Sequence, residues 1–217
     1  MSLLSLTPDE VLSTTRAVRR RLDFSRPVER NLIEECLRIA QQAPSGSNNQ
    51  GWHFIVVTDA EKRRALADIY RRSWARYAEQ PSFIGKLRFA DDERDAVQQR
   101  TASSARYLAD HMHEVPVLVI PCIAGERATL TATNQAGFFG SIIPAAWSFC
   151  LAARARGLGT CWTSLHLQFE GEAAAVLGIP FDQFIQVALI PLAHTKGTDF
   201  KAAPRDPVEK IVHWESW

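Results

Sequence analysis

The chain has few cysteines, and their placement excludes several kinds of structure. It holds four cysteines in 217 residues, and they show no C-x-x-C spacing. Each one lies among apolar residues: Cys36, Cys122, Cys150 and Cys161. Buried free thiols in a reducing cytoplasm fit this pattern better than a disulfide framework or a zinc site.

Strong charge and long apolar runs are also missing. The formal net charge is +1, which gives no reason to expect a nucleic-acid or membrane partner. We find no continuous apolar run of the ~20 residues needed to span a bilayer. The N-terminus lacks the charged-then-apolar plan of a signal peptide. These features predict a cytoplasmic protein.

Common nucleotide and metal motifs are absent from the sequence. No G-x-G-x-x-G follows an expected strand and no G-x-x-x-x-G-K-[ST] occurs, which argues against the two standard nucleotide-binding folds. His111 and His113 would point in different directions on a helix, and no carboxylate–histidine spacing accompanies them. We therefore expect no metal site.

The composition is that of an ordinary globular protein, 46% hydrophobic and 23% charged. We expect one domain over residues 1–217 with a polar arm over about 193–217. Apolar periodicity and caps predict helices over 8–20, 28–43, 60–79, 91–112, 131–156 and 169–177, the fifth kinked by Pro144. Strands are expected over 53–58, 115–123, 158–165 and 184–192. Their irregular alternation with helices fits an α+β fold better than a regular parallel sheet.

Arginines gather where the first expected helix ends. Arg16, Arg19 and Arg20 share one face at helical spacing, and Arg21 follows them. A bound anion would relieve the repulsion between these like charges. The alternative is a solvated basic helix end, which the helix dipole favours, and spacing alone leaves both open. A second basic element, residues 201–205, by itself indicates a surface arm.

Two loop segments are rich in small residues. Residues 43–52, between an expected helix and strand, are small, polar and permissive, which suits close approach to a flat polar ligand but also suits a plain connector. Residues 157–159 follow a helix, and by themselves they indicate a left-handed cap and a tight entry into a strand.

Taken together, these segments resemble the nitroreductase family of FMN-dependent, NAD(P)H-using oxidoreductases. The resemblance runs from about residue 13 to 215. Residues 16–20 are similar to the family's phosphate motif, residues 43–52 to its flavin loop, and residues 157–163 to its segment over the isoalloxazine. Residues 205–214 are similar to its C-terminal ending.

The resemblance implies an α+β fold with a central, mostly antiparallel sheet flanked by helices. It also implies an intertwined homodimer that binds FMN at its interface. NAD(P)H would give a hydride to flavin N5 and leave before a small electron acceptor, such as a nitroaromatic or a quinone, takes the electrons in a ping-pong cycle. The flavin carries this chemistry, so no catalytic protein residue is expected.

The resemblance also assigns cofactor-binding residues in three groups. Arg16, Ala17, Arg19 and Arg205 would lie at the FMN phosphate, with Arg20 as a further contact. The partner subunit would contribute the flavin loop through Pro44, Ser45, Gly46 and Asn48. Thr163, Ser164 and Leu165 would lie along the isoalloxazine.

Some features depart from the family pattern and leave alternatives open. Ala17 stands where the family usually has serine, and Thr15 stands where it has an arginine. Ser164 or His166 lies where some members place a glutamate near flavin N5. Residues 60–110 match least and would shape substrate entry. Related chemistries therefore stay open, among them dehalogenation, azoline or peptide dehydrogenation and flavin breakdown. A non-catalytic flavin-binding redox sensor also stays open.

NADPH is slightly favoured over NADH as the electron donor, because arginines at 71, 72 and 76 suit a 2′-phosphate.

Overall fold

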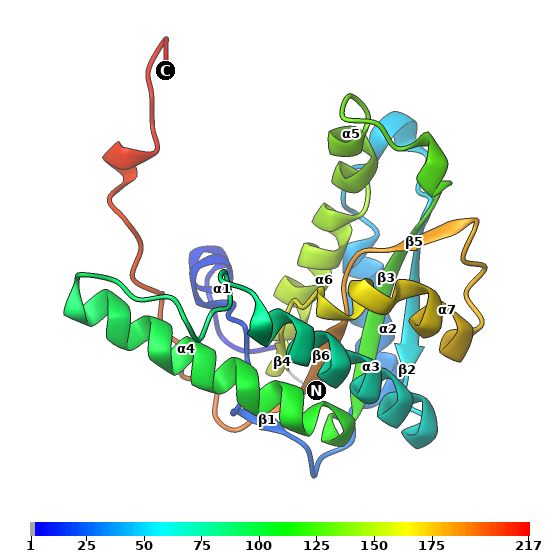
Figure 1. Ribbon diagram of the computed structural model, residues 1–217, viewed down its shortest axis with the longest axis horizontal. Helices are drawn as coiled ribbons and strands as arrows, with labels where there is room; N and C mark the ends of the chain where they lie inside the picture. The colour runs from blue at the N-terminus through cyan, green and yellow to red at the C-terminus, as the bar shows by residue number, and fades with distance from the viewer. Residues whose placement is uncertain (1–2) are drawn as a thin grey trace.

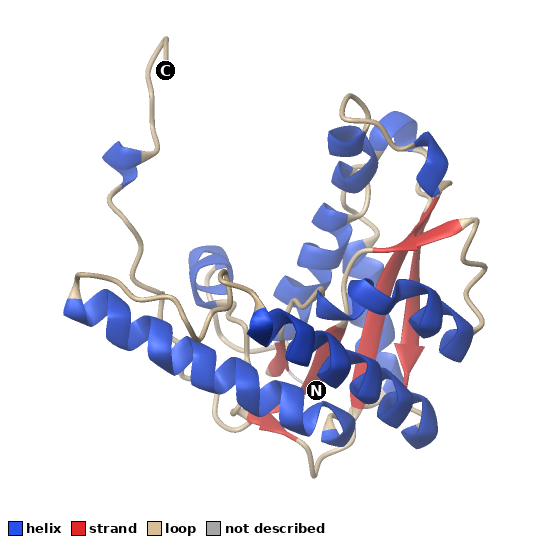
Figure 2. Ribbon diagram, viewed as in Figure 1, coloured by secondary structure: helices blue, strands red, loops and turns tan. Residues whose placement is uncertain are grey.

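One sheet runs through the structure, and helices cover both of its faces (Figure 1, Figure 2). The computed structural model describes residues 3–217. The strands are β1 (Leu22–Asp23), β2 (Trp52–Val57), β3 (Val117–Ala124), β4 (Leu158–Thr160), β5 (Phe184–Gln186) and β6 (Ile190–Thr195). The helices are α1 (Pro8–Thr14), α2 (Arg30–Ala40), α3 (Ala60–Glu79), α4 (Asp92–His111), α5 (Gln135–Gly140), α6 (Ile143–Ala155) and α7 (Glu170–Leu177).

The strand order is β1–β6–β3–β2, with β4 also paired to β6 and β5 to β3. All of these pairings between the described strands are antiparallel. The expected α+β fold with a central, mostly antiparallel sheet is therefore confirmed. That residues 1–217 form a single domain stays a prediction.

Side chains of β3 alternate between two apolar cores, one on each face of the sheet. Leu118 and Ile120 lie in a core that they share with residues of α3 and α7. Val117 and Val119 lie in the opposite core, with residues of α2 and α6. Because none of the four is more than 1% exposed, β3 is the central strand on which both layers of helices pack.

The four cysteines are free and buried, as expected. Burial raises the pKa of the Cys36 thiol to about 11 and the pKa values of Cys122 and Cys150 to about 12. These thiols therefore stay protonated at neutral pH and act as small apolar side chains.

The first helix is shorter than expected. α1 ends at Thr14, so the arginines of residues 16–20 do not share a helical face. The backbone N–H of Val18 instead donates to the carbonyl of Thr160 at 2.8 Å. Pairing with a segment distant in sequence therefore replaces the helical hydrogen bonds that the local spacing suggested.

The helix expected over 131–156 is two helices. α5 ends at Gly140, and α6 begins at Ile143 with Pro144 in its first turn, so this proline starts a helix and does not kink one. The stretch Gln135–Ala155 is long and apolar enough to cross a membrane by length and composition, although we expected no such run. α6 packs against α2 and the sheet, which is the position of a core helix.

The strand expected over 184–192 is interrupted by a β-bulge. β5 and β6 pair with β3 in registers that differ by one residue, so residues 187–189 lie opposite only residues 120–121. Pro121 offers no N–H to the ladder. Leu189 pairs with Thr163 instead, which draws the segment after β4 against the sheet.

The C-terminal arm begins later than expected. β6 runs to Thr195, so residues 193–195 belong to the sheet. Beyond it the chain turns away, and its last residues extend from the body of the molecule (Figure 1). Ile211 is 73% exposed and Trp214 is 83% exposed, so this arm presents apolar side chains to its surroundings.

Candidate functional site

The arginine segment is held against β4 by a close backbone contact. Ala17 forms a parallel bridge with Thr160. Gly159 makes this approach feasible, because a Cβ atom there would meet Val18 Cβ at 3.0 Å and Thr195 Cγ2 at 2.7 Å. The fold therefore brings two of the predicted site segments together, residues 16–20 and residues 157–163.

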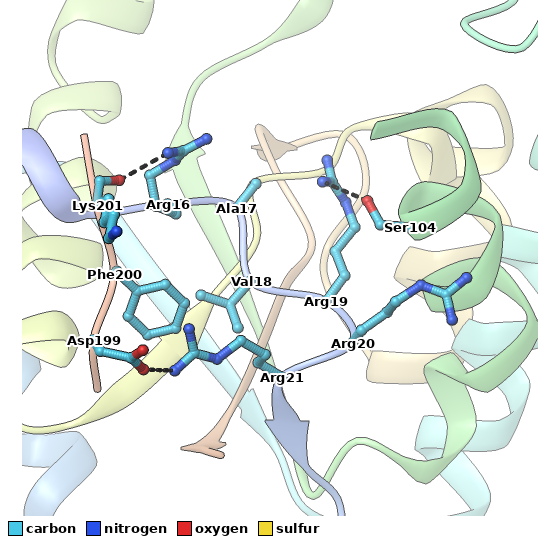
Figure 3. Close-up of a pocket in the computed structure, with 10 residues that line it drawn as sticks. All are labelled: Arg16, Ala17, Val18, Arg19, Arg20, Arg21, Ser104, Asp199, Phe200 and Lys201. Carbon is cyan, nitrogen blue, oxygen red and sulfur yellow. Dashed lines mark hydrogen bonds and ion pairs between the residues drawn. The ribbon is translucent and has the colours of Figure 1, made fainter. Parts of the chain in front are cut away.

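A hollow of about 310 Å³ opens beside this contact (Figure 3). It is lined by Arg16, Ala17, Val18, Arg19, Arg20, Arg21, Ser104, Asp199, Phe200 and Lys201. Five of these side chains are cationic and one is a carboxylate. Such an excess of positive charge over one concave surface suits a multiply charged anion.

Hydrogen bonds hold the arginine side chains around the hollow (Figure 3). Arg16 Nη1 donates to the carbonyl of Lys201 at 2.9 Å, and Arg19 Nη1 donates to Ser104 Oγ at 3.3 Å. Both acceptors are neutral, so the two guanidinium charges are not neutralised by these bonds. Each guanidinium has five N–H donors, and the remaining ones can reach an anion.

Arg20 and Arg21 make other contacts than Arg16 and Arg19. Arg20 is exposed, donates to Ser103 Oγ at 3.0 Å and lies over the ring of Tyr107 at 4.8 Å. Arg21 pairs with Asp199 at 2.5 Å, and this hydrogen bond lowers the pKa of the Asp199 carboxyl. Arg21 is thus already neutralised, which leaves Arg16, Arg19 and Arg20 as the arginines suited to an anion.

The predicted isoalloxazine segment adjoins this hollow. Thr163 Oγ1 donates to the carbonyl of Leu189 at 2.6 Å, while Ser164 is exposed and Leu165 packs partly against the core. The bridge between Ala17 and Thr160 places the arginine segment at a point three residues before Thr163 along the chain. A ligand anchored at the arginines can therefore extend along residues 163–165.

The predicted flavin loop lies elsewhere on the same chain. The backbone N–H of Gly46 donates to Ser141 Oγ at 2.9 Å, between α5 and α6. Figure 1 shows this loop beside α5, well apart from the segment between α1 and β1 that carries the arginines. Pro44 and Asn48 are exposed, and Ser45 is half-buried. One chain therefore does not bring the loop and the arginine hollow together.

The backbone of this loop is strained. Ser47, Asn48 and Gln50 have φ of 53°, 53° and 51°, although none of them is glycine. Left-handed conformations of this kind cost free energy and gather at ligand sites. Internal hydrogen bonds hold them, such as that from Gln50 N to Ser45 Oγ at 3.0 Å. These hydrogen bonds give the loop a fixed conformation at the surface.

Arg205 stands apart from the other arginines. It is exposed in the C-terminal arm, and its Nη1 donates to the neighbouring carbonyl of Pro204 at 2.9 Å. It is not among the described residues that line the hollow. Its role at a phosphate stays a prediction.

His166 is fully buried, so it is not available beside a surface-bound ring. Burial lowers the pKa of His166 to about 4, and the neighbouring Gln186 offsets only part of this effect. Of the two residues considered near flavin N5, only Ser164 is exposed.

The buried His166 should make stability depend on pH. Between pH 6.5 and about 4 the unfolded chain protonates this imidazole, whereas the folded chain does not. Lowering the pH through this window should therefore cost about 1.4 kcal/mol of unfolding free energy per pH unit from this residue. Urea unfolding at several pH values, compared between the wild type and His166→Asn, measures the difference in slope. Equal slopes would show that His166 protonates alike in both states.

Several residues at the hollow were not predicted from the sequence. Ser104 comes from α4, and Asp199 and Phe200 lie just before the basic element at residues 201–205. The sequence showed α4 only as a charged helix, and nothing in its pattern indicated which turn meets the arginines. Their tertiary placement is what makes them part of the site.

The sequence profile of the nitroreductase family matches residues 12–194. The chain therefore belongs to the nitroreductase family. Family membership indicates an oxidoreductase and a flavoprotein.

Individual relatives differ in what they do. The 4-nitrobenzoate reductase of Nocardioides sp. is 27% identical over an alignment of 227 residues that covers 94% of this chain and 88% of that protein. The 5,6-dimethylbenzimidazole synthase of Rhodospirillum rubrum is 28% identical over 148 residues, which cover 64% of this chain and 61%, less than two thirds, of that protein.

Solved structures share the fold. The crystal structure of the FMN and NADPH-dependent nitroreductase NfnB derived from sphigopyxis sp. strain HMH has a TM-score of 0.68 and 23% identity, over 98% of this chain and 100% of that chain. At this level of identity the likeness concerns the fold.

Proposed function

We propose that this protein is an FMN-dependent oxidoreductase that passes electrons from NAD(P)H to a small electron-poor acceptor, such as a nitroaromatic or a quinone. The observation that carries the proposal is the cationic hollow next to the bridge between Ala17 and Thr160, which leads into residues 163–165. Because the chain belongs to the nitroreductase family, a flavin is a better candidate for this hollow than an unrelated anion. Four buried free thiols support a reducing, cytoplasmic setting.

The hollow fits the phosphate of FMN. Arg16 and Arg19 keep free donors, and Asp199 is occupied by Arg21. The exposed Arg20 donates to a serine hydroxyl and pairs with no carboxylate among residues 3–217. When bound, the flavin would take a hydride from NAD(P)H and pass electrons to the acceptor in a ping-pong cycle. The protein's own residues supply no nucleophile or general base in this scheme.

The chain's residues would bind and orient the cofactor. The arginines would fix the phosphate, and the rigid pairing of Thr163 with Leu189 would hold residues 163–165 as a flat edge for the ring. Backbone N–H groups along such an edge stabilise negative charge that develops on a bound ring. Ser164 would face the bound ring from the exposed side of this segment.

A complete site would need two copies of the chain. The flavin loop and the arginine hollow lie apart in one chain, so a homodimer could bring the loop of one copy to the arginines of the other. Exposed apolar side chains support such an interface. They include Ile143 and Trp147 on α6, at 43% and 42% exposure, and the arm residues Ile211 and Trp214.

The choice between NADH and NADPH rests on three arginines of α3. Arg71 pairs with Asp68 at 2.6 Å, and Arg72 pairs with Glu172. Arg76 lies over the ring of Phe169 at 4.3 Å. Arg76 is therefore the best placed of the three to meet a 2′-phosphate, and a slight preference for NADPH remains part of the proposal.

A second candidate is different flavin chemistry on the same scaffold, as the similarity to a 5,6-dimethylbenzimidazole synthase suggests. A non-catalytic flavin-binding redox sensor is a third. Steady-state oxidation of NADPH by FMN-loaded protein, with a quinone or a nitroaromatic as acceptor, separates them. Acceptor-dependent turnover supports the reductase, whereas flavin binding without turnover would favour the other two.

Replacing Asn48 by alanine should weaken FMN retention without unfolding the chain. Asn48 is exposed and its Oδ1 accepts a local hydrogen bond from Gln50 Nε2 at 3.1 Å, so the substitution removes little packing. Alanine tolerates the φ of 53° less well than asparagine, so we expect a loss of about 1 kcal/mol of unfolding free energy. We expect an increase in the FMN Kd of about tenfold, the size of one or two hydrogen bonds, with only a small decrease in the unfolding midpoint. Equilibrium dialysis and urea unfolding measure the two quantities. An unchanged Kd would leave the loop as a simple connector.

A further inference from the structure

The hollow contains one side chain whose chemistry differs from the rest. Among the described residues that line it, Ser104 alone carries a hydroxyl. The cations can only donate hydrogen bonds and the carboxylate can only accept them, whereas a hydroxyl does both. Ala17, on the same lining, presents only a methyl group.

The contacts of Ser104 place its oxygen within the network of the arginines. Its Oγ accepts from Arg19 Nη1 at 3.3 Å (Figure 3). It also donates to the carbonyl of Thr101 at 2.9 Å. The first bond is long for a hydrogen bond, and the second is a local bond within α4. The hydroxyl hydrogen can rotate away from Thr101, so the same oxygen can donate to an anion that Arg19 binds.

Its neighbour Ser103 has a different position. Ser103 is exposed, whereas Ser104 is half-buried and lines the hollow. Ser103 Oγ accepts from the exposed Arg20 at 3.0 Å. Two adjacent serines on one helix therefore offer a matched comparison between a hydroxyl inside the hollow and one outside it.

We propose that Ser104 is a phosphate ligand of this site, donating a hydrogen bond to the anion held by Arg16 and Arg19. The inference rests on the proposed FMN function and extends it to α4, a helix that the motifs of the sequence did not connect to the cofactor. With this ligand, α4 forms one wall of the phosphate site. The bound cofactor would then contact both α4 and the arginine segment beside β4.

The test compares FMN with riboflavin, which lacks the phosphate, by fluorescence titration of the full chain. Ser104→Ala should raise the FMN Kd about tenfold, as loss of a hydrogen bond to a charged group does, and leave the riboflavin Kd unchanged. Ser103→Ala removes a hydrogen bond to the exposed Arg20 but no hydroxyl from the hollow, so it should raise the FMN Kd much less than Ser104→Ala does. Adding Ala17→Ser to Ser104→Ala returns a hydroxyl to the hollow and should recover most of the lost FMN affinity.

The outcomes separate this inference from the function on which it rests. If the wild type binds FMN and Ser104→Ala binds it equally well, Ser104 is not a ligand although the flavin proposal stands. An equal loss of FMN and riboflavin affinity would show a structural role for Ser104 and overturn the inference. If the wild type binds neither flavin, the proposed function fails and this inference fails with it.

Discussion

Replacing Arg19 by glutamine should weaken FMN binding about 10- to 100-fold, the range for losing hydrogen bonds to a charged group. Arg19 is half-buried in the wall of the hollow and donates to Ser104 Oγ at 3.3 Å, so its guanidinium is held in place before any ligand binds. Riboflavin affinity should change little, because in the proposed site the lost charge would face the phosphate. Fluorescence titration with the two flavins measures both.

A substitution on α4 controls for the loss of net charge in Arg19→Gln. Arg106 is exposed and pairs with Asp110 at 3.3 Å, away from the hollow, so Arg106→Gln removes one positive charge without touching the site. It should leave the FMN Kd at the wild-type value. If Arg106→Gln weakens FMN as much as Arg19→Gln, the effect is one of net charge and Arg19 is not a specific ligand.

Replacing Gly159 by alanine should destabilise the protein by about 1–3 kcal/mol, as overpacking of a tight core does. The added Cβ would lie 2.7 Å from Thr195 Cγ2, 2.9 Å from Leu22 Cδ2 and 3.0 Å from Val18 Cβ. Relieving these close contacts would push the arginine segment away from β4, so FMN affinity should fall as well. Urea unfolding gives the loss of stability directly.

Gly171 in α7 provides the matched control. An added Cβ there would meet Phe181 at 3.7 Å, which is ordinary contact. Gly171→Ala should therefore be neutral or slightly stabilising by helix propensity. A Gly159→Ala protein as stable as Gly171→Ala would show that the β4 contact tolerates an extra methyl, and the proposed positioning role of Gly159 would be wrong.

The sequence predicted the elements whose signals are local. α3 has the expected bounds, and Asp59 caps it by accepting from the Lys62 N–H at 2.9 Å. β3 was expected as a buried strand because its residues are almost all apolar, and it is the centre of both cores. Such features depend on periodicity and caps, which a single sequence displays.

Features that depend on distant pairing were not predictable in this way. The end of α1 is decided by the bond from Val18 to Thr160, and the β5–β6 break is decided by Pro121 on another strand. Ser104 joins the hollow only because α4 packs beside the arginine segment. The motifs indicated which residues matter, but the contacts among them come from tertiary structure.

We propose that each cofactor site combines the arginine hollow of one chain with the flavin loop of another. This arrangement can be tested by mixing two defective proteins, Arg19→Gln and Asn48→Ala, whose subunits are dissociated and then reassociated together. In a mixed dimer one site would receive both defects and the other would receive neither. Random pairing would then restore wild-type FMN affinity to about a quarter of all sites, although neither variant alone has such sites. If the mixture shows only the two weakened affinities, or if the protein remains a monomer by light scattering, the shared site is contradicted.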